Sequence, residues 1–558
     1  MSKTVADDLA KQHKSISIAE FFEKNRHLLG FDSKIKAMLT CVKEAVDNSL
    51  DACEEYASEL RKRKKPFELP DLLVRVDLVK DEIYKIIVED NGPGITRAIA
   101  PKVFAKLLYG SKFHRLKQGR GQQGIGISAS GLYGQMTTGK PTRIISKTGP
   151  DNSAYIMELM LDIKTNEAKI IRDEEYARFS RDNGTRVEIV LEGTYRATGD
   201  KSIYEYLRRT SISNPHAKIV FIDPKGERFT FKRATETLPA ETKEIKPHPW
   251  GLELGKLTRM LEDTKKNTAL SFLTDEFSKM GVTTAKGILE KAHVNPKRKP
   301  DSVTIEEATD ILKNMQKADL QRPPTDCLSP VGRGAIEKSL RVEFNPEFIA
   351  ATTRPPNVYR GYPFQVEAAL AYGGDIPEGN ADVMRIANKV PLLYESGACA
   401  ITHSVNETDW KRYGITKNRG SNSPTAPLII LVHVCSVWVP FTSESKAAVA
   451  NYPIIIKEIK LALQECARQL KMFLHKKMKS IRAAQKINTF VKYGSMMAKS
   501  LSDLTSKDEK MINELITKVI EKKYEVNVNE IKNKIKNNDN ERDVVVKSPE
   551  KIEKEDEE

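Results

Sequence analysis

Apolar and polar positions recur along this chain with two different periods, and each period predicts one kind of element. Around residues 35–53 the apolar positions repeat with the spacing of a helix. Glu44, Asn48 and Asp51 stand at positions i, i+4 and i+7 and therefore line up on the opposite face. The pattern predicts a helix with one buried stripe and one polar face. The members of the apolar stripe are Ile35, Met38, Leu39, Val42, Ala45, Val46, Leu50 and Cys53.

Alternating or short apolar runs predict strands over residues 72–79, 84–90, 143–147 and 186–191. Helical patterns lie between them, so residues 16 to about 240 read as an α/β sandwich. A hairpin over residues 218–232, with Pro-Lys-Gly at its turn, is expected to close this part.

Beyond this hairpin the pattern changes twice. Residues 245–330 are helical, and from residue 331 the pattern is mixed again, with an apolar strand pair predicted over residues 428–441. Within the helical part, helices are predicted over residues 257–264, 271–280 and 305–318.

The polar face of the first helix suits magnesium nucleotide chemistry. A carboxylate such as that of Glu44 can act as a general base toward water. The amide oxygen of Asn48, together with water, can complete the octahedral oxygen shell of magnesium. The bland alternative, that these acids are only a solvated helix face, is the more common reading of such a segment taken alone.

Two glycine-containing segments change that balance. Asp90 opens the turn Asp-Asn-Gly-Pro-Gly at the end of a predicted strand, where its carboxylate can accept a hydrogen bond from an adenine amino group. Residues 119–126 carry four glycines, whose exposed backbone amides can bind phosphate oxygens. By itself the first segment is a common chain reversal.

Two decoy motifs fail on inspection. Residues 119–124 fit the dinucleotide fingerprint, but no predicted strand precedes them and no acid follows at the ribose position. Residues 134–140 resemble a P-loop until Pro141 replaces the Ser or Thr that holds magnesium. Protein-kinase signatures are also absent from the sequence.

The order of these motifs, followed by Asn183-Gly184-Thr185, resembles the Bergerat-fold (GHKL) ATPases. Within that superfamily the chain is similar to the B subunits of DNA topoisomerase VI, over roughly residues 15–500. The segments that carry this resemblance are residues 104–109, 119–128, 135–141, 246–251, 385–394 and 440–446.

The resemblance implies an α/β multidomain fold and an organisation with six parts. They are an N-terminal arm (1–15), a GHKL ATPase domain (16–244), a helix-two-turns-helix domain (245–330), a transducer domain (331–475), a long basic transducer helix (476–506) and a charged, disordered tail (507–558). It also implies that Lys446 reaches from the transducer to the terminal phosphate of ATP, as a point charge that loses its partner on hydrolysis.

The expected cofactors are ATP and magnesium. Glu44 and Lys446 are the predicted catalytic residues, Asn48 is the predicted magnesium ligand, Asp90 is expected to read adenine, and Thr185 is expected to reach the adenine pocket through water. The full set of predicted nucleotide contacts is Asn48, Asp51, Asp90, Gly94, Ser111, Lys112, Arg120, Gly121, Gln122, Gln123, Gly124, Ile125, Gly126, Ile127, Thr185 and Lys446.

Composition agrees with this interpretation. A length of 558 residues favours three to four domains at about 150 residues each. No run of about 18 apolar residues and no signal-peptide core occur, so a cytoplasmic location is expected.

The six cysteines include no Cys-x-x-Cys pair, which argues against a disulfide framework and a zinc site. Cys399 and His403 could lie near each other, but without two further ligands we interpret them as packing residues and not as a zinc site.

The net charge of +15 predicts a polyanionic partner. The tail of residues 507–558 holds 12 basic and 15 acidic residues, so the rest of the chain carries +18. Residues 466–502 contain nine Lys or Arg and no Asp or Glu, and Leu470, Phe473, Leu474, Met478 and Ile481 recur at helical intervals. This predicts a helix with one packed side and one basic side, which faces DNA, a partner protein or only solvent.

If the resemblance holds, ATP closes two B subunits on each other, the N-terminal arm crosses to the partner, and hydrolysis resets a gate for double-stranded DNA in a heterotetramer of two A and two B subunits. No strand-cleaving chemistry is visible, and cleavage is expected in the topoisomerase VI A subunit. Two alternatives remain open: another Bergerat ATPase, such as a chaperone or mismatch-repair clamp, and a DNA-binding module with a dead ATP site.

Overall fold

A computed structural model of the 558-residue chain describes residues 16–110, 115–121, 124–418, 423–443 and 446–524. The chain divides into two compact units. The first comprises Met1–Thr408 and Lys417–Cys466, and the second comprises Asp409–Thr416 and Ala467–Glu558.

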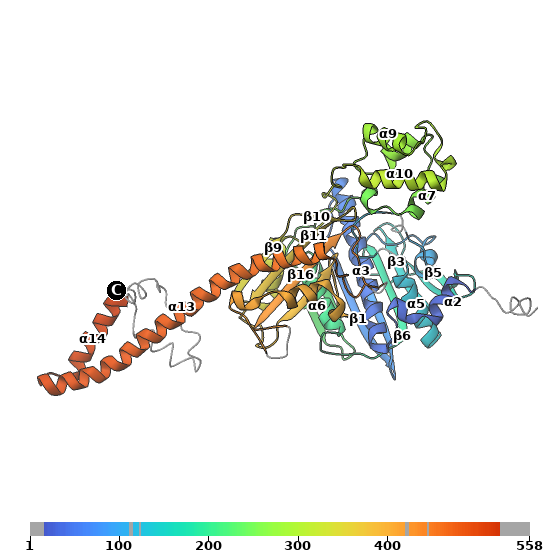
Figure 1. Ribbon diagram of the computed structural model, residues 1–558. Coiled ribbons are helices and arrows are strands. Elements are labelled where there is room, and N and C mark those ends of the chain that lie inside the picture. Colours follow the sequence, from blue (N-terminus) through green and yellow to red (C-terminus); the bar gives the residue numbers. More distant parts are fainter. Residues whose placement is uncertain (1–15, 111–114, 122–123, 419–422, 444–445, 525–558) are drawn as a thin grey trace, which may run out of the picture. The chain divides into compact units, whose positions relative to one another are not determined.

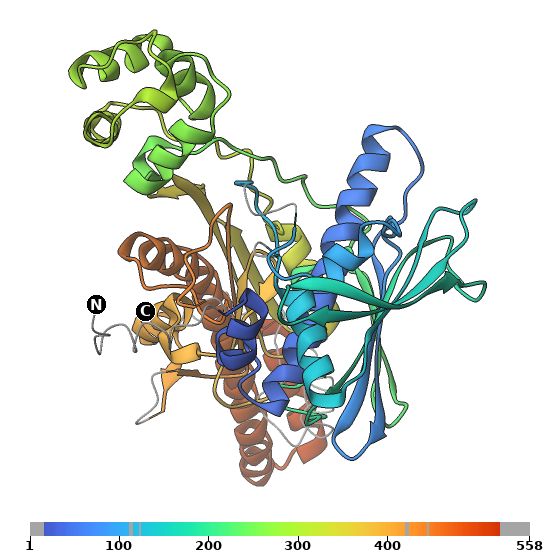
Figure 2. The same cartoon turned by 90° about the vertical axis from the view of Figure 1, so that its right-hand side faces the viewer.

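An eight-stranded sheet organises the N-terminal part of the first unit, in the order β5-β4-β3-β6-β2-β1-β7-β8 (Figure 2). All neighbouring strands are antiparallel except β1 and β7. All four predicted strands and the predicted hairpin are present. The strands are β1 (Asp71–Lys80), β2 (Ile83–Glu89), β3 (Thr142–Thr148), β4 (Tyr155–Asp162), β5 (Glu167–Glu175), β6 (Asn183–Glu192), β7 (Lys218–Ile222) and β8 (Arg228–Phe231).

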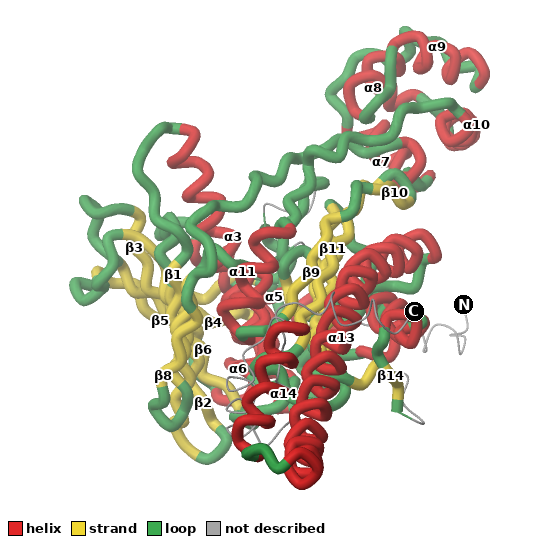
Figure 3. The backbone as a smooth tube through the Cα atoms, turned by 90° about the vertical axis from the view of Figure 1, so that its left-hand side faces the viewer, coloured by secondary structure: helices red, strands yellow, loops and turns green. Residues whose placement is uncertain are grey.

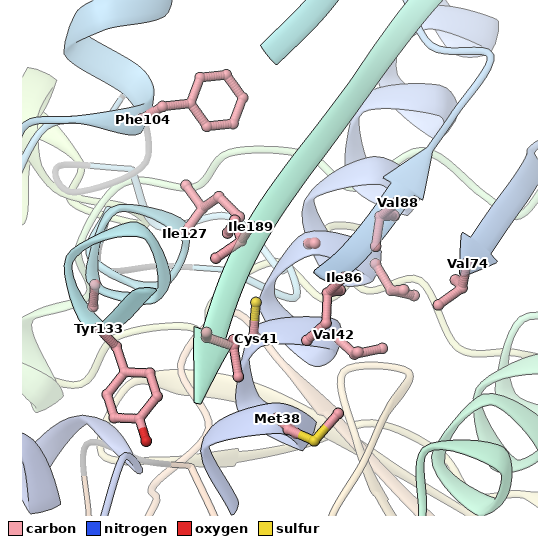
Figure 4. Packing of buried hydrophobic residues seen from close by; sticks show 14 of the residues in the cluster. Met38, Cys41, Val42, Val74, Ile86, Val88, Phe104, Ile127, Tyr133 and Ile189 are labelled. Atoms are coloured by element: carbon pink, nitrogen blue, oxygen red, sulfur yellow. The ribbon is translucent and has the colours of Figure 1, made fainter. Parts of the chain in front are cut away.

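Helices α3 and α5 pack against one face of this sheet (Figure 2). The predicted apolar stripe of α3 is buried except for Ile35, which is half-buried. Figure 4 shows Met38, Cys41 and Val42 in the same cluster as Ile86 and Val88 of β2. The polar face of α3 is therefore turned away from this core. The helices of this part are α2 (Ile18–Lys24), η1 (Arg26–Leu29), α3 (Lys34–Lys62), α4 (Ala100–Phe104), α5 (Gly126–Thr138) and α6 (Ile203–Ser213).

A group of short helices follows (Figure 1). It has its own core, which includes Leu257, Phe272, Leu289 and Met315. The three predicted helices are present, but the second ends at Glu276, because the next residue, Phe277, takes an extended backbone and is buried. The helices are η2 (Pro249–Gly251), α7 (Leu254–Asp263), α8 (Ala269–Glu276), α9 (Val282–Lys291), η3 (Pro300–Ser302) and α10 (Ile305–Lys317).

A six-stranded sheet organises the rest of the first unit, in the order β10-β11-β16-β12-β13, with β9 paired to β11. Helix α11 packs against β9, and both are labelled in Figure 3. The elements are α11 (Arg333–Phe344), β9 (Phe348–Thr353), β10 (Asn357–Tyr359), β11 (Tyr362–Tyr372), β12 (Asp382–Ala387), β13 (Val390–Pro391), η4 (Ser396–Ala398), α12 (Ala400–Glu407), β14 (Thr416–Lys417), β15 (Pro424–Thr425) and β16 (Leu428–Ser436).

The predicted strand pair over residues 428–441 is wrong, because this segment forms one strand, β16, that ends at Ser436. The hydroxyl of Ser436 donates to the Pro363 carbonyl at 2.8 Å and accepts from the Trp438 amide at 3.1 Å. This side-chain turn replaces the ladder bonds, and Pro440 has no amide hydrogen with which to resume them.

Helix α13 (Pro453–Thr505) is continuous through the predicted boundary at residue 475, so that boundary falls inside one helix. The second unit contains residues 467–505 of α13, together with η5 (Trp410–Tyr413) and α14 (Glu509–Tyr524). Predicted disorder of the tail is therefore wrong for residues 509–524, where apolar residues recur at helical spacing within a charged sequence. Residues 525–558 and the N-terminal arm lie outside the described residues.

All six cysteines are free and buried. Among the described residues, no group of three or more His, Cys, Asp or Glu side chains is arranged to hold a metal ion. No helix within the described ranges combines the length and apolar character needed to cross a membrane. The cytoplasmic location stays a prediction from the sequence.

Candidate nucleotide site

A cavity of about 590 Å³ opens beside the polar face of α3. Its volume lies within the range that small-molecule sites occupy. Glu44 and Asn48 of α3, Asp90 after β2, and Lys446 all line it, although they are far apart in sequence. Of the other predicted contacts, those that also line it are Gly94, Gly121, Gly124, Ile125, Gly126, Ile127 and Thr185.

Asp90 is fixed at one end of the cavity, with 5% of its surface exposed. Its carboxylate accepts hydrogen bonds from the Ser49 hydroxyl at 2.8 Å, the Gly92 amide at 2.9 Å and the Thr185 amide at 3.2 Å. Burial raises the pKa of the Asp90 carboxyl, and these three bonds oppose that shift. A carboxylate has about four acceptor positions, so one remains for a ligand donor such as an adenine amino group.

The backbone around Asp90 depends on two glycines. At Gly184 (φ +140°) a Cβ atom would lie 2.1 Å from the carbonyl oxygen of Asp90. At Gly94 (φ +71°) a Cβ atom would lie 2.1 Å from the carbonyl oxygen of Lys147. Side chains larger than hydrogen are therefore excluded at both positions, and the turn is held directly against β3 and β6.

Two asparagine side chains form hydrogen bonds that hold the turn after Asp90 in place. The Asn183 amide donates to the carbonyl of Gly92 at 2.7 Å, and the Asn91 side-chain oxygen accepts from the amide of Asp71 at 2.9 Å. Thr185 contributes its backbone to Asp90, while its hydroxyl lies 3.3 Å from that of Ser146. The end of the cavity at Asp90 is thus formed by protein contacts alone.

The other end of the cavity combines Glu44, Asn48 and the start of α5. A Cβ atom at Gly126, the first residue of α5, would lie 1.8 Å from Oε2 of Glu44, so this carboxylate packs against the bare backbone of the helix N-terminus. A Cβ atom at Gly121 would lie 3.6 Å from Oδ1 of Asn48. Helix N-termini present free amides to anions, which suits phosphate groups at this end.

Lys446 approaches this end from the segment after β16. Its ammonium donates to the carbonyl of Arg120 at 3.2 Å. Burial lowers the pKa of the Lys446 ammonium, and the neighbouring Glu44 raises it. Its backbone is left-handed, with φ +52°, which is uncommon for lysine. Lys446 therefore lies in the same cavity as Glu44, and its contact with a terminal phosphate stays a prediction.

Asp51 and Arg120 lie elsewhere than expected. Neither lines the cavity, and the Arg120 guanidinium instead binds the Asp51 carboxylate at 2.6 Å and also contacts Glu54 and Asn214. These carboxylates raise the pKa of Arg120 against the effect of burial. As nucleotide contacts the two residues stay predictions, whereas in the structure they bind each other and hold the glycine-rich loop to α3.

Asp47 is a buried acid next to the site that the sequence did not single out for a role. It is 5% exposed, and the Tyr206 hydroxyl donates to its Oδ1 atom at 3.0 Å. Burial raises the pKa of Asp47 to about 7. It is therefore a carboxyl group that changes charge near neutral pH within one helical turn of Glu44.

The remaining predicted contacts, Ser111, Lys112, Gln122 and Gln123, lie outside the described residues. Conversely, sequence reasoning missed Ser49, Glu54 and the cavity wall at residues 391–394. Ser49 stands next to Asn48 in a helix, and nothing in its sequence context points to a strand end 41 residues away. Residues 391–394 belong to a segment that supported the resemblance but had no assigned role.

Magnesium fits this end as an ion with one protein ligand. Asn48 is exposed in the cavity, and neither its amide nor the Glu44 carboxylate makes a side-chain hydrogen bond within the described part of the chain. Magnesium commonly keeps several waters and binds phosphates with one or two protein oxygens. The single amide oxygen of Asn48, beside the N-terminus of α5, is compatible with this mode of magnesium binding.

The predicted basic helix has a less regular surface than expected. Leu470 is fully buried, but Met478, expected on the packed side, is 49% exposed. Farther along α13, Met496, Met497 and Leu504 are exposed as well. The helix therefore offers apolar side chains together with its basic ones.

Two family models match the chain. Residues 33–192 match the histidine kinase-, DNA gyrase B- and HSP90-like ATPases, and residues 323–486 match the transducer of the topoisomerase VI B subunit. The first match contains Glu44, Asn48, Asp90 and Thr185, and the second contains Lys446. An ATP-binding domain and a transducer are thus present in one chain.

Relatives match over nearly the whole length of this chain. The B subunit of type 2 DNA topoisomerase 6 from Methanococcoides burtonii is 47% identical over 521 residues, which cover 93% of this chain and 82% of the relative. The protein of the same name from Archaeoglobus fulgidus is 46% identical over 512 residues, covering 92% and 83%. Among solved structures, the chain is similar to the DNA gyrase B subunit of Myxococcus xanthus with a TM-score of 0.39 at 12% identity, covering 81% of this chain and 95% of that one. The chain belongs to the family of type 2 DNA topoisomerase 6 B subunits.

Proposed function

We propose that this chain is the component of a type IIB DNA topoisomerase that binds and hydrolyses ATP, and that a separate A subunit cleaves the DNA. The convergence of Glu44, Asn48, Asp90 and Lys446 on one cavity is the observation that carries this proposal.

In this proposal the adenine amino group donates to Asp90, whose other acceptor positions are already filled by Ser49, Gly92 and Thr185. An oxygen held this firmly favours a donor at the base edge over another acceptor. This arrangement selects adenine over guanine, which carries a carbonyl at the equivalent position.

The phosphates extend toward the N-terminus of α5, with Gly121, Gly124 and Gly126 allowing close backbone approach. Asn48 holds magnesium, which would neutralise charge on the phosphates. Glu44 orients a water molecule and removes its proton. Ser111 and Lys112 are proposed to close over the same phosphates.

Lys446 is proposed to bind the terminal phosphate. In the structure its ammonium donates to a carbonyl, at 3.2 Å from the Arg120 oxygen. Exchange of this neutral acceptor for a phosphate oxygen gives a stronger, charge-assisted bond, and hydrolysis removes that acceptor again. The transducer would thus detect whether the γ-phosphate is present.

We further propose that ATP closes two copies of the chain on each other within an assembly of two A and two B subunits, and that duplex DNA passes through the resulting gate. The basic and exposed apolar side chains of α13 support a role in contacting DNA or the cleavage component of the assembly. The helical group of residues 245–330 is a second candidate for DNA contact.

The decisive test measures ATP hydrolysis by the purified chain alone, with supercoiled DNA, and with DNA and a coexpressed A subunit. We expect hydrolysis to be stimulated by DNA, and relaxation of supercoils to require both proteins and ATP. Hydrolysis without any relaxation by the pair would favour a different Bergerat ATPase, whereas DNA binding without hydrolysis would favour a DNA-binding module with a dead site.

A further inference from the structure

The loop that leads into the glycine-rich segment is held by residues that come from beyond the ATPase part. We call residues 118–121 the lid base. The Gln118 side chain donates to the Ser329 carbonyl at 3.0 Å and accepts from the Ser329 amide at 2.8 Å. The carbonyl of Gly119, one residue on, accepts from the side-chain amide of Asn388 at 3.2 Å. None of these three hydrogen bonds involves Lys446.

Asn388 and Lys389 form a left-handed turn between β12 and β13, with φ of +47° and +67°. The Asn388 side chain also donates to the Ser436 carbonyl and accepts from the Ser436 amide, each at 2.9 Å. This amide therefore joins the lid base to the end of β16 directly. The turn is 5% exposed at both residues, so these bonds are shielded from water.

Lys389 adds a charged contact to the same junction. Its ammonium donates to the Ser329 hydroxyl at 3.1 Å and lies 4.0 Å from Oε2 of Glu54. Glu54 is also the partner of Arg120 in the lid base, and burial together with Arg120 lowers the pKa of the Lys389 ammonium. Two buried cations thus share one carboxylate, and a displacement of Arg120 changes the electrostatic environment of Lys389.

On its other side the turn is tied to the centre of the second sheet. The Lys389 amide donates to Nε2 of His433 at 3.0 Å, and Nδ1 of His433 lies 2.8 Å from Oε2 of Glu367. Both of these side chains are fully buried. The Glu367 carboxylate in turn accepts from the amides of Val331 and Gly332, just before α11. Motion of the turn is therefore resisted by a packed and satisfied hydrogen-bond network.

We propose that Asn388 and Lys389 are positioning residues that hold the lid base and form a second link, beside Lys446, between the phosphate end of the cavity and the second sheet. The inference rests on the proposed function, because the lid base must respond to nucleotide for the link to matter. Neither residue touches the nucleotide in this account, and each acts through Gly119 or Arg120.

Hydrogen–deuterium exchange of the full chain, with and without a non-hydrolysable ATP analogue, tests the link. In the wild-type chain we expect the analogue to slow exchange at the adenine end, in residues 83–95, and also in residues 382–391 and 428–436 of the second sheet. The variant Asn388→Asp keeps the acceptor for the Ser436 amide and tolerates a left-handed backbone, but it replaces the donor to the carbonyls of Gly119 and Ser436 with an oxygen.

For Asn388→Asp and for Lys389→Met, protection at residues 83–95 is expected to persist, whereas the nucleotide-induced slowing in the second sheet falls about fivefold, as the loss of roughly 1 kcal/mol predicts. Lys389→Arg, which keeps the charge, should restore most of it. The control Lys338→Met removes an exposed lysine of α11 and should change neither region.

The possible failures are distinct. Absence of protection at residues 83–95 in the wild-type chain would refute nucleotide binding and hence the proposed function. Protection there, with the same response of the second sheet in wild type and both variants, would overturn the link alone. Basal exchange of β11 in each variant reports whether the sheet is folded, so a misfolded variant is recognised, and Lys389→Arg then decides the outcome.

Discussion

The two ends of the nucleotide cavity differ in how much of their structure the protein itself supplies. At the adenine end, Asp90 receives three hydrogen bonds and sits on backbone that admits only glycine at two contact points. At the phosphate end, Glu44 and Asn48 face the cavity without a side-chain hydrogen bond within the described ranges. The end at Asp90 is preorganised by the protein. At the other end, Glu44 and Asn48 are available to bind a ligand, a metal ion or water.

This difference teaches that binding and turnover depend on different kinds of residue in one cavity. Preorganised groups discriminate between ligands, because an unsuitable ligand leaves buried polar atoms unpaired. Side chains without a hydrogen bond in the described part of the protein, such as those of Glu44 and Asn48, act only when phosphate, metal and water are bound. Substitutions at the two ends should therefore separate affinity from rate.

The largest effect is expected at the phosphate end. Glu44→Gln removes the proposed base while keeping the side-chain volume, so kcat for ATP hydrolysis should fall by about 10²–10⁴-fold. Binding of a fluorescent ATP analogue should change little. Glu55→Gln, an exposed acid on the same helix, is the matched control. Equal turnover in Glu44→Gln and wild type would remove the base assignment.

The next effect is expected at the adenine end. Asp90→Asn places a donor where the adenine amino group needs an acceptor, so the Kd for ATP should rise about 10–100-fold. The same change should narrow the preference for ATP over GTP, because an amide can donate to the guanine carbonyl. Calorimetry with both nucleotides measures this ratio, and Asp151→Asn on an exposed loop is the control. An unchanged ATP/GTP ratio would contradict the role of Asp90.

A smaller effect is expected for the proposed magnesium ligand. Asn48→Ala should weaken nucleotide binding about tenfold in the presence of magnesium, equivalent to roughly 1.4 kcal/mol, and much less in its absence. Titrations with and without magnesium give this difference directly. If the loss is the same under both conditions, Asn48 contacts the nucleotide itself rather than the ion.

The smallest effect concerns stability beneath the phosphate end. Since the pKa of Asp47 is raised to about 7, the folded chain keeps a proton that the unfolded chain releases near pH 4. Increasing pH across this window therefore lowers the free energy of unfolding. Asp47→Asn removes this loss and keeps an oxygen for Tyr206, so its melting temperature relative to wild type should rise by a few degrees from pH 5 to pH 8. A difference that does not vary with pH would show that Asp47 is ionised throughout.

Local patterns predicted the elements that build the site. The buried stripe of α3 follows from helical spacing, and the placement of Asp90 follows from a strand that ends in a glycine-containing turn. Sequence periodicity failed where side chains override it: Ser436 ends β16 through its own hydroxyl, and the charged tail conceals the apolar spacing of α14. Such endings depend on individual hydrogen bonds or on weak patterns within polar sequence.

Contacts between distant segments were the least predictable. Asp51 was expected to face the nucleotide because it shares a helix face with Glu44 and Asn48. The seven residues between Glu44 and Asp51 add a rise of about 10 Å along the helix axis, and at that distance the Asp51 carboxylate binds Arg120. The pairing of Asn388 with Gly119 spans 269 positions in sequence and leaves no local signature. Residues 385–394 were noted only because they resemble the corresponding family segment, and no contact was predicted for them.

The burial of all six cysteines has a practical consequence for following motion in this protein. The thiolate is the reactive form, and burial raises the pKa of Cys41 to about 12 and that of Cys435 well above its usual value. Maleimide reagents should therefore react only slowly with the cysteines of the folded chain. A single cysteine introduced on an exposed position, for example in place of Lys338, would accept a fluorophore or cross-linker without prior removal of native thiols.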